Sequence, residues 1–195
     1  MKVSTLRAAL ALFMALALAA CGGKATYPVT GIVSNLTNPG LVLENGSDTL
    51  SVPVGATSFT MPQQVSYGTQ FDVEVKTQPD HMSCVLSGNQ GSAGFTTTIV
   101  ADVVCTQNSY TVGGTVNGLN ADGLVLADGS AIAALTVPSG STSFIFSGTV
   151  YYGSTYGVTV LTQPTGLTCS VVNGTGIMGE GVVSNVIVNC VPNPS

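Results

Sequence analysis

Cysteine is the residue type with the clearest chemical potential in this chain. The sequence contains five, at Cys21, Cys84, Cys105, Cys169 and Cys190. A zinc site of four thiolates needs C-x₂₋₄-C pairs, and no such pair occurs. Cys84 and Cys105 are 21 positions apart, as are Cys169 and Cys190. Among the three possible pairings of four cysteines, this recurring spacing favours the disulfides Cys84–Cys105 and Cys169–Cys190, with no metal site.

The fifth cysteine, Cys21, follows a short export signal. Lys2 and Arg7 are the only charged residues before it, and Ala8 to Ala20 is an uncharged run rich in Ala and Leu. A helix that spans a bilayer needs about 20 apolar residues, so this run is too short. The sequence Leu18-Ala-Ala-Cys21 resembles the bacterial lipobox. The resemblance implies cleavage before Cys21, lipidation of its thiol and an anchor in a membrane.

Ordinary secretion is the alternative interpretation of this signal. Ala17-Leu-Ala19 fits an A-x-A cleavage site, which would leave a soluble exported protein. An odd thiol in an exported chain needs an explanation, and lipidation of Cys21 supplies one. Residue 22 is Gly rather than Asp, and by resemblance to enterobacterial sorting this favours an outer-membrane lipoprotein, facing either the periplasm or the surface.

Two motifs resemble ligand-binding loops. Gly174 to Gly179 reads G-x-G-x-x-G, but a dinucleotide loop must open a helix, whereas here another predicted strand follows, so we predict a turn and no cofactor. Asn120-Ala-Asp-Gly123 is part of a calcium-loop pattern, but Gly118 and Gly129 occupy the positions where such a loop needs an oxygen ligand and a Glu. A turn is the better interpretation here as well.

The titratable side chains suggest no catalytic set. Asp72 and Glu74 share one face of a predicted strand and could hold a weak metal ion, but Lys76 continues the same row, which is typical of a solvated charged stripe. The only histidine, His81, lies between predicted strands, and no G-x-S-x-G elbow accompanies it. We therefore predict no catalytic residues and no enzyme.

Charge excludes one class of partner. Beyond the predicted signal the chain has two lysines and nine acidic residues, a formal charge of −7, and no Lys or Arg follows Lys76. Proteins that bind nucleic acid neutralise phosphates with clustered basic side chains, so nucleic-acid binding is excluded. The positive mean hydropathy argues against a disordered stalk.

The chain contains two copies of one unit. Tyr27–Asn108 aligns with Tyr110–Asn193 almost end to end, at an offset of 83 residues where Gly31 matches Gly114, and of 85 after a two-residue insertion. Alternating apolar residues and intervening turn residues predict an all-β fold of two tandem seven-stranded immunoglobulin-like β-sandwiches after a cleaved signal helix. In the second copy the predicted strands are Tyr110–Val116, Leu124–Ala127, Ala133–Val137, Ser143–Phe146, Thr155–Thr162, Thr168–Val172 and Val182–Val191.

The repeat resembles a tandem module of predicted bacterial lipoproteins and secreted proteins. Its marks in the second copy are Tyr110–Val116, Gly123–Leu126, Thr162–Pro164, Cys169 and Cys190. The predicted organisation is a signal peptide (1–20), a lipidated tether (21–26) and two β-sandwich repeats (27–108 and 109–193).

These observations predict a lipid-anchored cell-envelope protein with a non-catalytic structural, adhesion or binding role and an unidentified protein or glycan partner. The alternative is a hydrolase or carbohydrate-active protein. Glu180 and Asp128 are the carboxylates to examine for that alternative, because a glycosidase-like pair would face a groove within about 10 Å of each other.

Overall fold

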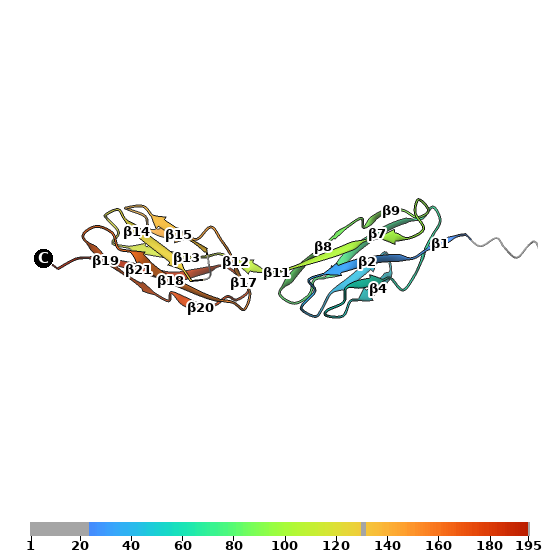
Figure 1. Cartoon of the computed structure of the whole chain (residues 1–195), viewed down its shortest axis with the longest axis horizontal. Coiled ribbons are helices and arrows are strands. Elements are labelled where there is room, and N and C mark those ends of the chain that lie inside the picture. The colour runs from blue at the N-terminus through green and yellow to red at the C-terminus, as the bar shows by residue number, and fades with distance from the viewer. Residues whose placement is uncertain (1–23, 130–131, 195) are drawn as a thin grey trace, which may run out of the picture. The chain divides into compact units, whose positions relative to one another are not determined.

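The computed structural model describes residues 24–129 and 132–194 (Figure 1). Cys21 and the predicted signal helix lie outside these residues. Within the described ranges the chain forms strands and turns and no α-helix, so the all-β prediction is confirmed. No helix in this part of the chain is long and apolar enough to cross a membrane.

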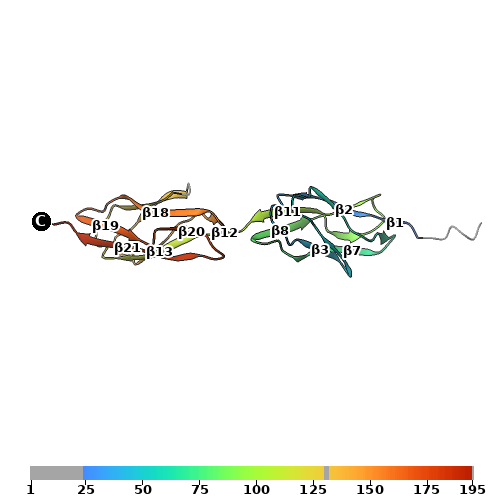
Figure 2. The same ribbon diagram turned by 90° about the horizontal axis from the view of Figure 1, so that it is seen from below.

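The described chain divides into two compact units. One comprises residues 24–77 and 85–104, and the other comprises residues 78–84 and 105–194. Residues 78–84, which the sequence repeat places in the first β-sandwich, therefore belong to the second compact unit. Figures 1 and 2 show the strands of each unit as two layers.

The second repeat has two four-stranded sheets, with strand orders β16-β13-β21-β19 and β15-β14-β18-β20, and a short β12-β17 pair. Its strands are β12 (Ser109–Tyr110), β13 (Val112–Asn117), β14 (Leu124–Asp128), β15 (Ile132–Val137), β16 (Ser143–Ile145), β17 (Val150–Tyr151), β18 (Thr155–Thr162), β19 (Leu167–Val172), β20 (Thr175–Ile177) and β21 (Val183–Pro192).

The first repeat has the same plan. One sheet has the order β10-β2-β11-β8 with β5 also on β2, another has the order β4-β3-β7-β9, and β1 pairs with β6. The strands are β1 (Thr26–Tyr27), β2 (Val29–Ser34), β3 (Val42–Asn45), β4 (Asp48–Ser51), β5 (Ser58–Thr60), β6 (Val65–Ser66), β7 (Gln70–Thr77), β8 (Met82–Ser87), β9 (Gln90–Ser92), β10 (Ile99–Val100) and β11 (Asp102–Gln107).

Alternation along the strands builds the core. Successive side chains on a strand point to opposite faces, so every second residue faces the opposing sheet. In β14 these residues are Leu124 and Leu126, and in β21 they are Val186 and Val188, all of which are fully buried. Burial of each such side chain contributes about 1.5–3 kcal/mol. The apolar pattern that predicted the strands is therefore the pattern that holds the two layers together.

The predicted strand count is incomplete. All seven strands predicted for the second repeat are present, with bounds within two residues of those expected. Three further strands, β12, β17 and β20, contain only two or three residues each, which is too short for alternation to reveal them. The expectation of an immunoglobulin-like β-sandwich also did not include the pairing of the first long strand with the last one.

In each repeat the first long strand lies parallel to the last. β13 pairs with β21 from Val112↔Val183 to Asn117↔Asn189, with a register shift between Val112 and Gly114. In the first repeat β2 pairs in parallel with β10 and then with β11. This ladder occupies the middle of its sheet, so the strands on both sides depend on it.

A glycine permits this close pairing in both repeats. A Cβ at Gly114 would lie 1.8 Å from the carbonyl oxygen of Val186, and a Cβ at Gly31 would lie 2.0 Å from that of Ala101. Both contacts are with backbone atoms, which cannot swing aside as a flexible side chain can. Only glycine fits at these two equivalent positions, which explains the glycine in the repeated Tyr-x-x-x-Gly motif.

We expect Gly114→Ala to lower the free energy of unfolding of the second unit by about 1–3 kcal/mol, because the added methyl group forces β13 away from β21. Denaturant unfolding measures this change. Gly157→Ala is the matched control, since a Cβ at Gly157 meets no atom within 4 Å. Equal stability of the two variants would show that the strands separate without cost.

Candidate functional site

The two carboxylates of the enzyme alternative lie in different surroundings. Asp128 is only 4% exposed, and its Oδ1 accepts a hydrogen bond from the backbone N–H of Gly157 at 2.9 Å. Glu180 is exposed and lines a shallow groove with Tyr156 and residues 179–185, and Asp128 does not line this groove. A catalytic carboxylate pair must face one shared space, so this arrangement gives no support to a glycosidase-like site.

Asp128 has a structural counterpart in the first repeat that sequence reasoning missed. Asn45 occupies the equivalent position, and its Oδ1 accepts a hydrogen bond from the backbone N–H of Asp72 at 3.0 Å. Asn45 ends β3 as Asp128 ends β14, and each side chain bonds the neighbouring strand. Because Asn performs the same task without charge, the carboxylate of Asp128 has a structural role.

The glycine-rich segment also has a structural role. Thr175–Ile177 forms strand β20, which pairs with β18, so the segment does not open a helix. A Cβ at Gly176 would lie 2.6 Å from the Tyr156 hydroxyl, and a Cβ at Gly174 would lie 2.6 Å from the Val158 carbonyl oxygen. The glycines provide room for β18, and the segment lacks the helix N-terminus that a dinucleotide needs.

The acidic residues considered as metal ligands make local contacts. Asp122 Oδ1 accepts a hydrogen bond from the backbone N–H of Ser139 at 3.2 Å, which joins the loop before β14 to the loop after β15. Lys76 forms an ion pair of 3.0 Å with Glu44 on the neighbouring strand β3. Among the described residues, no group of three or more His, Cys, Asp or Glu side chains is placed to hold a metal ion.

A groove of about 470 Å³ runs beside the β3–β4 turn of the first unit and is lined mostly by amides, hydroxyls and carboxylates. Two of its polar side chains already bind backbone groups. Asp48 accepts a hydrogen bond from the Gln63 N–H at 2.9 Å, and Asn45 accepts the bond from Asp72. The groove therefore shows turn-stabilising contacts and no set of convergent reactive groups.

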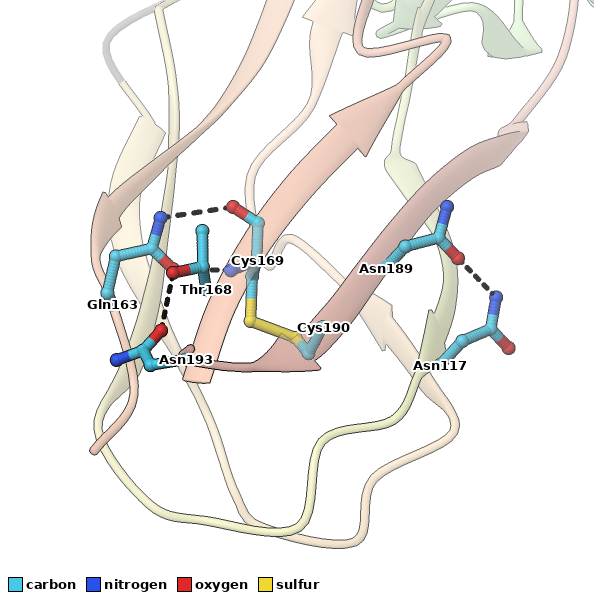
Figure 3. The surroundings of a disulfide bond; sticks show 7 residues. All are labelled: Asn117, Gln163, Thr168, Cys169, Asn189, Cys190 and Asn193. Atoms are coloured by element: carbon cyan, nitrogen blue, oxygen red, sulfur yellow. Dashed lines mark hydrogen bonds between the residues drawn. A yellow bond between two sulfur atoms is a disulfide. The ribbon is translucent and has the colours of Figure 1, made fainter. Parts of the chain in front are cut away.

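The most developed local arrangement surrounds each disulfide. The structure contains the bridges Cys84–Cys105 and Cys169–Cys190. Figure 3 shows the second bridge between β19 and β21, where Cys169 and Cys190 are direct cross-strand partners. The bridge thus joins neighbouring strands of one sheet, unlike the inter-sheet bridge of immunoglobulin domains.

A glutamine clamps the outer side of this bridge. The Gln163 side chain donates from Nε2 to the Cys169 carbonyl oxygen at 3.0 Å, and its Oε1 accepts from the Cys169 N–H at 2.7 Å (Figure 3). In the first repeat, Gln78 makes the same two bonds with Cys84, at 3.0 Å and 2.6 Å. The sequence Thr-Gln-Pro, which occurs at 77–79 and at 162–164, therefore supplies this clamp in both repeats.

The clamp satisfies a sheet edge. β19 is the last strand in its sheet, so backbone groups that point away from β21 have no strand partner. Both backbone groups of Cys169 bond to Gln163, so they point away from β21, and Cys169–Cys190 is a non-hydrogen-bonded pair. In such pairs the two residues lie closest together, which suits a direct bridge.

Further side-chain bonds flank the bridge (Figure 3). Asn117 Nδ2 donates to Asn189 Oδ1 at 2.9 Å, across the parallel ladder of β13 and β21. Thr168 Oγ1 donates to Asn193 Oδ1 at 2.6 Å, just beyond the end of β21. Neutral amides and a hydroxyl fix the last strand on both sides of the disulfide.

The single histidine belongs to a small surface cluster within the second unit. The His81 ring stacks on Tyr152 with 3.7 Å between centroids, and its Nδ1 pairs with Glu180 Oε1. The Tyr110 hydroxyl donates to Glu180 Oε2. This bond, followed by the bond from His81, lowers the pKa of Glu180, and the bond to Glu180 raises the pKa of Tyr110. These contacts hold an exposed turn against the surface of the second unit.

Comparison with known proteins gives no family. No family model matches the chain, and neither does any curated protein. Among solved structures, the C-terminal fragment of the pilus adhesin SpaC from Lactobacillus rhamnosus GG is 10% identical, with 87% of this chain and 99% of that chain covered and a TM-score of 0.43. The shaft pilin SpaA of the same organism is 9% identical (88% and 99% covered, TM-score 0.31). The minor pilin GBS52 of Streptococcus agalactiae is 9% identical (87% and 98% covered, TM-score 0.30).

These likenesses are too weak to carry a functional argument, but they correct one expectation. The matched proteins are pilus components, and the one from Streptococcus agalactiae is described as a minor pilin of a Gram-positive pathogen. None of these three is described as an outer-membrane lipoprotein. This finding contradicts the outer-membrane localisation predicted from Gly22, and we withdraw that assignment.

Loss of the glutamine clamp should destabilise the second unit. We expect Gln163→Ala to lower its free energy of unfolding by about 1–3 kcal/mol, because two hydrogen bonds to the Cys169 backbone disappear. Thr165→Ala, in the same turn, shortens an exposed side chain and leaves both bonds intact. Chemical denaturation of the two variants makes the comparison, and an equal loss of stability would contradict the role of the clamp.

The pKa of Glu180 should depend on Tyr110. Tyr110→Phe removes the hydroxyl that donates to the carboxylate, so we expect the pKa of Glu180 to rise toward its ordinary value. An NMR titration of the side-chain carboxyl carbon measures the change. Tyr151→Phe is the control, because Tyr151 is not among the groups that shift this pKa. An unchanged pKa in the Tyr110 variant would show that this bond does not form in solution.

Proposed function

We propose that the protein is an exported, lipid-anchored structural module without catalytic activity. The observation that carries this proposal is which features recur. The disulfide, the glutamine clamp and the close-approach glycine occur at equivalent positions in both repeats. All three are devices that hold strands together.

The side chains with potential for chemistry do not recur. His81 is the only histidine, and the segment of the first repeat that aligns with Glu180 contains no carboxylate. Both residues bond to neighbouring side chains on an exposed surface. A duplicated enzyme would be expected to duplicate its reactive groups, whereas this chain duplicates its framework.

Export is consistent with the bridges. Structural disulfides form and persist in oxidising compartments, and a small β-domain gains about 3 kcal/mol from closing a loop of this length. The signal-like sequence before Cys21 provides the route of export. Because β1 begins at Thr26, only a few residues separate the proposed lipid on Cys21 from the fold.

The anchor is tested by changing one atom at Cys21. We expect Cys21→Ser to move the protein from the membrane fraction to the soluble exported fraction, or to block its processing, because one side chain carries the acyl group. Metabolic labelling with an alkyne fatty acid should mark the chain that keeps Cys21 and not the variant. Ala25→Ser is the control and should keep both label and membrane association.

Ordinary secretion is the outcome that contradicts the anchor. In that case the chain that keeps Cys21 carries no acyl label. After a high-salt wash, the Cys21→Ser variant is found in the same fraction as the chain that keeps Cys21. The structural role would remain, because it depends on the described repeats alone.

A further inference from the structure

The direction of the first and last strands determines where the chain enters and leaves each repeat. β13 and β21 are parallel and paired from Val112↔Val183 to Asn117↔Asn189, with one register shift between Val112 and Gly114. The chain therefore enters at one end of this ladder, before Val112, and leaves at the opposite end, after Pro192. The first repeat follows the same rule, with β2 beside β10 and β11.

This arrangement determines how tension acts on a repeat. A pull on the two chain ends draws β13 and β21 in opposite directions along their own axes. The hydrogen bonds of the ladder lie across that direction, so they are strained together in shear. If both strands were pulled from the same end, the bonds would open one after another. Shear requires several bonds to break at once and so resists a larger force.

The disulfide redirects the tension at the exit. Cys190 lies near the end of β21, two residues before Pro192, and is bonded to Cys169 on β19. Tension from the carboxyl end therefore acts on β21 and, through the sulfur atoms, on β19 as well. Once the ladder has broken, residues 170–189, which include β20 and most of β21, stay inside the loop closed by the disulfide and are not stretched. The hydrogen bonds of Gln163 with Cys169, and of Asn117 with Asn189, lie next to this disulfide.

The first repeat places its bridge in the same way. Cys105 lies in β11, two residues before the strand ends at Gln107, and is bonded to Cys84 on β8. The neighbouring Gln78 clamps Cys84. The parallel ladder and the loop closed by the disulfide therefore occur in both repeats.

We propose that each repeat is a tension-resisting element whose extension the disulfide limits. This inference rests on the proposed structural role and adds a physical task to it, namely to transmit a pull between the anchored end and the other end of the chain. It requires no ligand and no lipid, so it can be tested on the protein alone.

The disulfide predicts a definite length. Each bridge has a sequence separation of 21 residues and a Cα–Cα distance of 3.9 Å. A fully extended chain spans at most about 3.6 Å per residue, so each closed loop hides about 70 Å of contour length. Reduction should therefore lengthen each unfolding event by about 70 Å, and by equal amounts in the two repeats.

Single-molecule force spectroscopy tests both parts of the proposal. The mature chain, with Cys21→Ser to leave only the four paired cysteines, is held by handles at its two ends, oxidised or reduced with dithiothreitol. We expect two unfolding events, each longer by about 70 Å after reduction. An increment that reduction leaves unchanged would overturn the claim that the disulfide limits extension.

A second pulling geometry tests the shear ladder without altering the core. One handle is moved to the side-chain position of Asn120, an exposed residue just beyond β13, and the other stays at the carboxyl end. Both handles then pull at the same end of the β13–β21 ladder. We expect the second repeat to unfold at a lower force than in end-to-end pulling, and an equal or higher force would overturn the proposal. Because Cys21 is replaced, failure of the lipid anchor affects neither result.

Discussion

The close approach of the first and last long strands is the constraint on which each repeat depends. Gly31 and Gly114 have no side chain, and this absence lets the two backbones meet where a Cβ would overlap a carbonyl oxygen. The parallel ladder that results lies in the middle of its sheet, with β16 on one side and β19 on the other in the second repeat. If β13 and β21 separated, this sheet would split into two pairs and expose Val186 and Val188.

The sequence predicted what is local and missed what is distant. Alternation along Thr155–Thr162 is a property of that segment alone, and the predicted strand matches β18. The parallel partner of β13 lies about 70 positions away, and the sequence of neither strand identifies the other as its partner. The sequence shows that the Tyr-x-x-x-Gly and Thr-Gln-Pro motifs repeat but does not show what they do. The structure does, because it places Gly114 of β13 against β21 and hydrogen-bonds Gln163 to Cys169.

The candidate chemistry failed for a related reason. Residue type indicates what a side chain could do, whereas burial and partners decide what it does. Asp128 suggested a carboxylate for catalysis, but the same position in the first repeat is Asn45, and both side chains accept a backbone hydrogen bond. An acceptor is all that the position requires. The alignment of the repeats already contained this signal, in the pairing of an acid with an amide.

The disulfide and the glutamine clamp have different structural roles at the sheet edge. The bridge holds β19 to β21 and adds no covalent link between the two sheets, which pack against each other through their apolar faces. Gln163 takes the place that a further strand would occupy beside Cys169, because its amide offers one donor and one acceptor, as a peptide unit does. An edge whose backbone groups are bonded in this way cannot offer them to another chain. The covalent bond thus keeps the last strand in place, while the amide occupies the outward backbone groups of Cys169 at the edge.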